Sequence, residues 1–182
     1  MWSRRRVLGA CLVLFLVLGL SAWVLAPVGF TWLELTDAET GRRIASRLLP
    51  DGERVVLTWK NSLFSLLVTE VFVAKGGILT LTEITFADPA GREPPRVKPA
   101  DVEDLYQTGG PFKAENLSRP FSRVVFRVGE IGNPVLRVGN QLVQFVREVG
   151  FGGAVLLVAR RPSLQERIAG WPFALLPPHF SP

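Results

Sequence analysis

Four polar residues near the middle of the chain have side chains that could bind a ligand or take part in a reaction. They are Asn61, Ser62, Glu70 and Glu83, and Glu70 lies within an otherwise apolar run. A hairpin that joins the two glutamate segments would bring their carboxyl groups opposite each other, where they can share a proton or hold a basic group. The alternative is that both carboxylates face water on the solvated side of a sheet. We treat these four residues as candidate binding residues.

The residue types that most catalytic and metal sites need are missing from this part of the chain. The only histidine is His179, near the C-terminal end, and the only cysteine is Cys11. No imidazole base is therefore available for a serine or cysteine nucleophile, and a zinc site fails for the same reason. No stretch has the spacing of a calcium loop. The sequence predicts a protein that is not an enzyme and that has no metal and no cofactor.

The N-terminal segment has the length and composition of a transmembrane helix. No charge occurs from Val7 to Leu25, a run of nineteen residues. As a helix this run would be about 28 Å long, enough to cross the hydrocarbon core of a bilayer. It is too long for a typical cleaved secretory signal, and Pro27 follows the best cleavage position. We predict an uncleaved signal anchor at residues 7–26, held by membrane lipid, with Trp23 at the membrane interface.

The charges around this segment predict its orientation. Arg4, Arg5 and Arg6 precede the apolar run, and the next basic residue is Arg42. The positive-inside rule places residues 1–6 in the cytoplasm and the chain after the anchor in the periplasm or another extracytoplasmic space. The same arginines also resemble a twin-arginine export signal, which is the alternative to a plain topology signal. The predicted location is the inner (cytoplasmic) membrane, crossed once.

The exported part is predicted to be a single domain. About 150 residues remain after the anchor, a length typical of one domain with its own core. The formal net charge of +5 falls to +2 when the three cytoplasmic arginines are set aside, and the other basic residues are scattered among acidic ones. This charge pattern is typical of a solvated surface, so we expect no binding of nucleic acid.

Short extended stretches separated by turn residues predict an all-β domain over residues 30–161. The strongest local pattern is a hairpin, with a Lys75-Gly76-Gly77 turn between two arms rich in β-branched residues. We expect a small sandwich or barrel of about eight or nine short antiparallel strands. The predicted strands are residues 32–36, 42–49, 54–59, 68–74, 78–86, 122–128, 134–138, 141–146 and 154–160.

Proline interrupts this pattern in two regions. Residues 87–99 contain four prolines and are predicted to form an exposed loop, followed by a short helical turn at residues 101–107. Residues 162–182 form an apolar, proline-rich tail that is too broken to span a bilayer. We expect this tail to pack on the domain or to be disordered, or else to touch the outer face of the membrane.

The motifs follow one another in a recognisable order, which is Asp37 to Gly41, Trp59, Asn61-Ser62, Val68 to Val73, Gly76-Gly77 and Leu79 to Phe86. This order resembles a bacterial family of unknown function, whose members are small exported or membrane-anchored β-proteins. They are often encoded beside tripartite (TRAP) transporters of the TAXI type, so the resemblance implies a transporter subunit or a solute-binding protein as partner. The chain departs from the family at Asn61, where the family has histidine, and in the loop after the hairpin. Only Ser62, Glu70 and Glu83 are carried over, without assigned roles.

Three hypotheses follow, and each predicts a different surface. The first is a non-enzymatic accessory protein of a transporter, with an exposed apolar patch on the order of several hundred Å². The alternative is a module that binds a small ligand or a cell-envelope polymer in a concave pocket with converging polar groups. The third, an enzyme of the carboxylate type, would hold a carboxyl group with a strongly raised pKa in a cleft.

Overall fold

The structure is a computed structural model that describes residues 12–16, 19 and 29–167. Most of the described domain lies in strands, which confirms the prediction of an all-β protein. Within the described ranges, no helix is long and apolar enough to cross a membrane. Most of the predicted anchor at residues 7–26, and residues 168–182 of the predicted tail, lie outside them.

One sheet has four antiparallel strands. They are β1 (Phe30–Asp37), β2 (Arg43–Pro50), β8 (Arg123–Arg127) and β11 (Ala154–Arg160). Their order is β2-β1-β11-β8, so that β2 and β8 are the edge strands of the sheet. Alternate residues of β1, including Leu33 and Leu35, are buried, because successive side chains of a strand point to opposite faces.

The other sheet has seven strands in the order β10-β9-β3-β4-β5-β7-β6. All of its pairs are antiparallel except the pairing of the two-residue β6 with β7. The strands are β3 (Arg54–Lys60), β4 (Leu67–Lys75), β5 (Ile78–Phe86), β6 (Arg96–Val97), β7 (Phe112–Phe121), β9 (Val135–Val138) and β10 (Gln141–Gln144).

The helical elements of the domain are short. A 3₁₀ turn, η1 (Pro99–Asp101), leads into α2 (Val102–Thr108), at the place where the sequence predicts a helical turn. The helix α3 (Phe145–Val149) follows β10 directly. The prediction of a strand over residues 141–146 is therefore wrong at its end, because the chain turns into a helix at Phe145, which is fully buried.

The described domain has eleven strands, more than the predicted eight or nine. The main omission is β7, which is ten residues long. The alternation of buried and exposed side chains along β7 is interrupted at Asn116, which has a φ of 60°. Ala114 and Leu117, three residues apart, are both buried, so the two-residue period does not hold across Asn116. Pro120, a residue that is rare inside strands, further conceals it.

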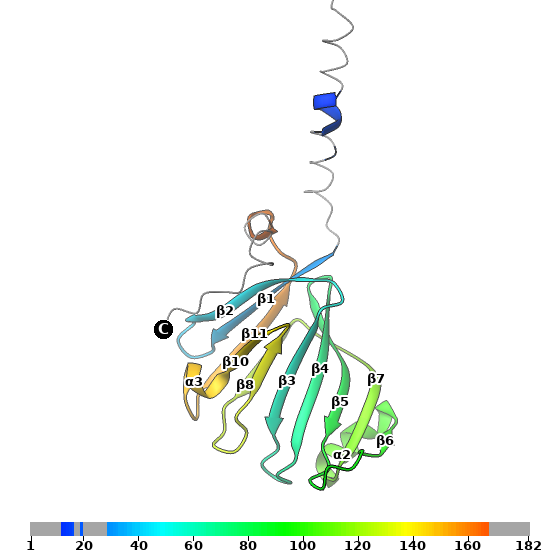
Figure 1. Cartoon of the computed structure of the whole chain (residues 1–182). Helices are drawn as coiled ribbons and strands as arrows, with labels where there is room; N and C mark the ends of the chain where they lie inside the picture. Colours follow the sequence, from blue (N-terminus) through cyan, green and yellow to red (C-terminus); the bar gives the residue numbers. More distant parts are fainter. Residues whose placement is uncertain (1–11, 17–18, 20–28, 168–182) are drawn as a thin grey trace, which may run out of the picture.

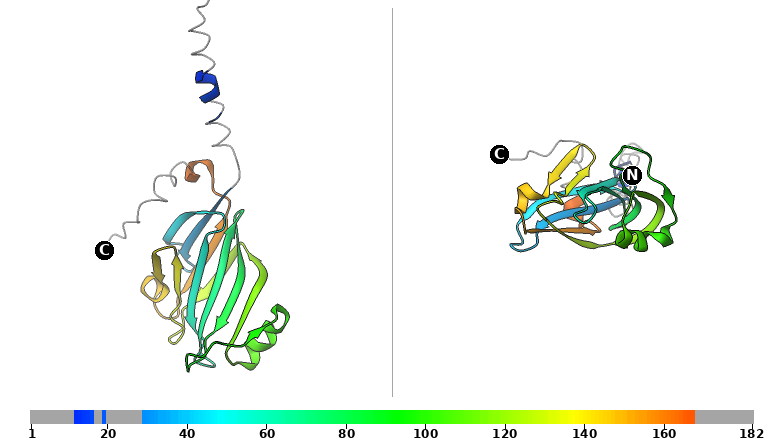
Figure 2. Two further views of the ribbon diagram at one scale, coloured as in Figure 1. Left: turned by 45° about the vertical axis from the view of Figure 1, so that its right-hand side comes forward. Right: turned by 90° about the horizontal axis from the view of Figure 1, so that it is seen from below.

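The two sheets face each other and enclose one core (Figure 2). Buried side chains from both sheets pack together, including Leu33 and Leu157 from the first, and Leu57, Ile84 and Leu136 from the second. One of the connections between the sheets, from β7 to β8, consists of a single residue, Ser122. The strand β5 contacts β11 across the core, and α2 lies beside β7 at the edge of the seven-stranded sheet (Figure 1).

The turn between β4 and β5 is packed against the ends of neighbouring strands. The Gly77 N–H donates to the hydroxyl of the buried Thr31 at 3.0 Å, and the Gly76 N–H donates to Asp51 at 3.1 Å. Both glycines have a positive φ, of 61° at Gly76 and 87° at Gly77. A Cβ on Gly77 would lie 2.5 Å from the backbone nitrogen of Arg161, whereas a Cβ on Gly76 would meet no atom within 4 Å.

We expect Gly77→Ala to destabilise the protein much more than Gly76→Ala. The left-handed conformation alone costs about 1 to 2 kcal/mol for a residue with a Cβ, and the overlap at Gly77 adds about 1 to 3 kcal/mol. Urea unfolding followed by tryptophan fluorescence measures the two free energies of unfolding. Equal losses in both variants would show that Gly77 does not make this close backbone contact.

Candidate functional site

Glu70 lies on the inner face of β4, in line with the buried Val68 and Phe72. Its Oε1 accepts a hydrogen bond from the hydroxyl of Tyr106 at 3.1 Å, and the side chain of Trp59 also donates to it. None of the ion pairs among residues 29–167 includes Glu70. This carboxyl group therefore points into the domain with two hydrogen-bond donors and no cation.

A cluster of aromatic rings positions these two donors. Phe86 at the end of β5 and Phe112 at the start of β7 are register partners, and their rings stack at 4.6 Å. Tyr106 packs edge-on against Phe86 at 5.2 Å, and Trp59 packs edge-on against the same ring at 6.5 Å. Such contacts favour defined ring orientations, so the hydroxyl of Tyr106 and the indole of Trp59 are held toward Glu70.

Glu70 lines a cleft of about 350 Å³ that opens between β8, α2 and the inner face of β4, β5 and β7. Its apolar walls are Phe72, Leu81, Phe121, Val124 and Phe126, and its polar groups are those of Glu70, Glu103, Tyr106 and Arg119. The rings of Phe72 and Phe121 meet edge-on at 6.1 Å. Sites for small molecules are typically about 300 to 1,000 Å³, mostly apolar, with a few converging polar groups, and this cleft has those properties.

Two β-bulges shape this part of the seven-stranded sheet. The register of β4 and β5 shifts at Thr82, whose hydroxyl donates to the carbonyl of Val71 at 3.1 Å. The register of β5 and β7 shifts at the same level, where Asn116 has its positive φ. Beyond this second bulge, Arg119 pairs with Leu81, and both residues line the cleft. A bulge redirects the side chains that follow it, which is how a charged residue of β7 reaches the inner face.

The charges at the mouth of the cleft balance each other. Arg119 and Glu103 form an ion pair at 3.5 Å, and their side chains are 41% and 70% exposed. An exposed pair of this kind contributes little to stability, but it neutralises the guanidinium of Arg119. The carboxyl group of Glu70 is then the only charge in the cleft lining that lacks an opposite charge among the described residues.

The surroundings of Glu70 change its acidity. Burial raises the pKa of the Glu70 carboxyl above its ordinary value of 4.5, and the hydrogen bonds from Tyr106 and Trp59 oppose this rise. Burial and the nearby Glu70 charge also raise the pKa of the Tyr106 hydroxyl. Tyr106 therefore stays protonated at neutral pH and acts as a hydrogen-bond donor.

The predicted pairing of Glu70 with Glu83 is wrong. A regular hairpin counted from the Gly76-Gly77 turn would place them opposite each other, but the bulge at Thr82 shifts the register by one residue. Glu70 pairs with Ile84, and Glu83 pairs with Val71 on the opposite face of the sheet. There Glu83 forms ion pairs with Lys113 at 3.5 Å and Arg54 at 3.8 Å.

Asn61 and Ser62 lie in the turn between β3 and β4, and neither lines the cleft. Asn61 is buried, and its Oδ1 accepts hydrogen bonds from the backbone N–H groups of Leu63 and Phe64, both at 2.9 Å. This amide thus stabilises its own turn. Ser62 is exposed. A binding role for these two residues stays a prediction.

Sequence reasoning missed Tyr106, Glu103 and Arg119 as members of this site. Tyr106 is the only tyrosine of the chain, and it lies within the predicted helical turn. This position in a short predicted helix is the one signal that could have identified it. Arg119 gave no signal because its strand was not recognised. Among the described residues, no group of three histidine, cysteine or acidic side chains could hold a metal ion.

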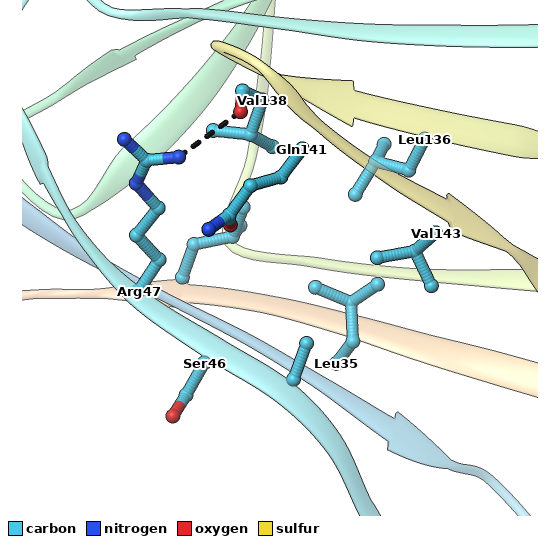
Figure 3. Close-up of a pocket in the computed structure, with 9 residues that line it drawn as sticks. Leu35, Ser46, Arg47, Leu136, Val138, Gln141 and Val143 are labelled. Carbon is cyan, nitrogen blue, oxygen red and sulfur yellow. Dashed lines mark hydrogen bonds between the residues drawn. The ribbon is translucent and has the colours of Figure 1, made fainter. Parts of the chain in front are cut away.

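A second cavity lies between β1, β2 and the hairpin of β9 and β10 (Figure 3). It holds only about 30 Å³, and Leu35, Leu136 and Val143 line it. Arg47 donates a hydrogen bond to the carbonyl of Val138 at 3.0 Å beside it (Figure 3). A space of this size has room for about one water molecule, so it is too small to be a ligand site.

We expect Glu70→Gln to remove a pH-dependent loss of stability. Because the folded-state pKa of Glu70 is raised, the folded protein binds this proton more tightly than the unfolded chain does. The contribution of Glu70 is therefore most favourable below pH 4.5, and it declines as the pH rises through the folded-state pKa. The Tm of the variant minus that of the native protein should increase over this range.

The matched control is Glu83→Gln, which removes a carboxylate of the same hairpin that faces outward and is paired with Arg54 and Lys113. Its Tm difference from the native protein should show no such increase. A flat Tm difference for Glu70→Gln across the titration would mean that the Glu70 carboxyl carries no burial penalty.

We expect Asn61→Ala to lower the free energy of unfolding by about 1 to 2 kcal/mol, because two backbone N–H groups lose their acceptor. The control Ser62→Ala changes an exposed residue and should stay within about 0.5 kcal/mol of the native value. Chemical denaturation measures both. An unchanged stability of Asn61→Ala would contradict the capping role.

No protein-family model matches the sequence, and comparisons with curated proteins and with solved structures found no similar protein.

Proposed function

We propose that this chain is a membrane-anchored extracytoplasmic module that binds a small molecule in the cleft at Glu70. The observation that carries this proposal is the position of Glu70. Its carboxyl group is held by Tyr106 and Trp59 inside a cleft with apolar, largely aromatic walls. A desolvated carboxyl group without a cation lowers the stability of the folded protein, and such costs are typical of functional sites.

Binding is favoured over catalysis by the other groups in the cleft. The lining, as far as the structure describes it, contains no serine, threonine, cysteine, histidine or lysine. Its second carboxyl group, that of Glu103, is paired with Arg119 at the mouth. A reaction of the carboxylate type needs a second group that reacts beside the first, whereas recognition needs only one well-placed charge and a fitting shape.

The proposed anchor has one further support. Residues 12–16 are helical, and all five apolar side chains are exposed, from 58% at Leu14 to 78% at Phe15. A helix that is apolar on every side is typical of a membrane span. The resemblance to proteins encoded beside TRAP transporters implies a transporter subunit or solute-binding protein as partner, and this association remains part of the proposal.

We expect a substitution that fills the cleft to abolish binding of a neutral aromatic probe. Val124 lines the cleft from β8, whereas the next residue, Val125, is 51% exposed on the other face of the same strand. Val124→Phe should therefore occupy space that a ligand needs, and Val125→Phe is the matched control. The full-length protein in lipid nanodiscs would be titrated with 4-fluorophenethyl alcohol and followed by ¹⁹F NMR line width.

Broadening that occurs in the native protein and in Val125→Phe, but falls to the level of empty nanodiscs in Val124→Phe, would support the cleft as the binding site. Equal line widths in all three proteins would overturn the proposal, because the probe would then be reporting lipid alone.

A further inference from the structure

We propose that the cleft selects an organic cation, in which an ammonium group pairs with the carboxylate of Glu70 and an apolar body lies among the aromatic walls. This inference rests on the proposed function and adds the chemical class of the ligand. It follows from the charges, the hydrogen-bond donors and the wall chemistry of the described residues.

The charges of the cleft lining favour a cation. The titratable or polar groups that face Glu70 come from β3, α2 and β7, and they are Trp59, Tyr106, Glu103 and Arg119. The guanidinium of Arg119 is already paired with Glu103. The residues that β5 and β8 contribute, Leu81, Val124 and Phe126, carry no charge. With Glu70 ionised, the lining therefore has a net charge of −1 and is complementary to a single positive charge.

The hydrogen-bond donors around Glu70 also favour a cation. A tryptophan side chain can only donate, and Tyr106 donates its hydroxyl proton to Glu70. Both contacts use the carboxyl group as an acceptor and so favour its charged form, while burial disfavours that form. A ligand ammonium group would supply the missing positive charge and N–H donors. A ligand carboxylate would instead bring two negative charges together in a partly desolvated site.

The walls of the cleft are largely aromatic. Phe72, Phe121 and Phe126 line the cleft together with the ring of Tyr106. Aromatic faces attract ammonium groups and also cover apolar surface, so the same walls suit both ends of such a molecule. The available volume of about 350 Å³ limits the ligand to the size of a small aromatic or branched aliphatic amine.

The test uses three probes that share one fluorinated phenyl body and differ in charge. They are 4-fluorophenethylamine, 4-fluorophenethyl alcohol and 3-(4-fluorophenyl)propanoate, titrated at pH 7.5 against the full-length protein in nanodiscs of uncharged lipid. A charge-assisted hydrogen bond predicts that the amine binds roughly tenfold more tightly than the alcohol, and that the propanoate binds most weakly.

Glu70→Gln should reduce the preference for the amine over the alcohol to about onefold, and a cooperative melting transition of the variant would show that it is folded. The control is Glu83→Gln on the outer face, which should keep the native preference. In the native protein, the preference for the amine should fall as the pH is lowered through the pKa of Glu70, because the carboxyl group then becomes neutral.

The possible outcomes separate this inference from the proposed function. If the alcohol binds in the native protein but not in Val124→Phe, and the amine binds no more tightly than the alcohol, the cation inference is overturned and the cleft remains a binding site. A preference for the propanoate would have the same meaning. If no probe distinguishes the native protein from Val124→Phe, both proposals are overturned.

Discussion

The edge of the four-stranded sheet at β8 is the constraint on which the candidate site depends. Across the core β11 contacts β5, and β8 follows β11 as the edge strand. At this edge, side chains of β8, of α2 and of the inner face of β4, β5 and β7 line the cleft. The cleft is thus bounded by the arrangement of several elements and not by any single side chain.

Glu70 shows how this architecture creates a site. Neighbouring residues of β4 on the same face are buried against the other sheet, where an unpaired carboxylate would be costly. At the position of Glu70 the covering layer gives way to the cleft, and hydrogen bonds from Tyr106 and Trp59 replace part of the lost hydration. The stacked rings of Phe86 and Phe112 in turn orient these donors, so the polar group depends on an aromatic core.

The two bulges connect the backbone to this chemistry. Both lie at one level of the sheet, at Thr82 and Asn116, and both change which residues reach the inner face. One turns Glu83 outward, where it pairs with basic residues at the surface, and the other brings Arg119 to the cleft. The inner face thereby retains one unpaired acidic group and one guanidinium that is neutralised by Glu103.

Local sequence determined the hairpin turn and most strands, because turn chemistry and two-residue alternation are local properties. It also identified Glu70 as a candidate site residue, because a charge among apolar neighbours is visible in the sequence. It also indicated the short helix that carries Tyr106. Only the tertiary structure decided that Glu70 faces the interior and Glu83 the solvent, since one bulged residue reverses the faces without a visible signal in the sequence. The same holds for β7 and Arg119, because packing between distant segments sets where an irregular strand pairs and what its side chains meet.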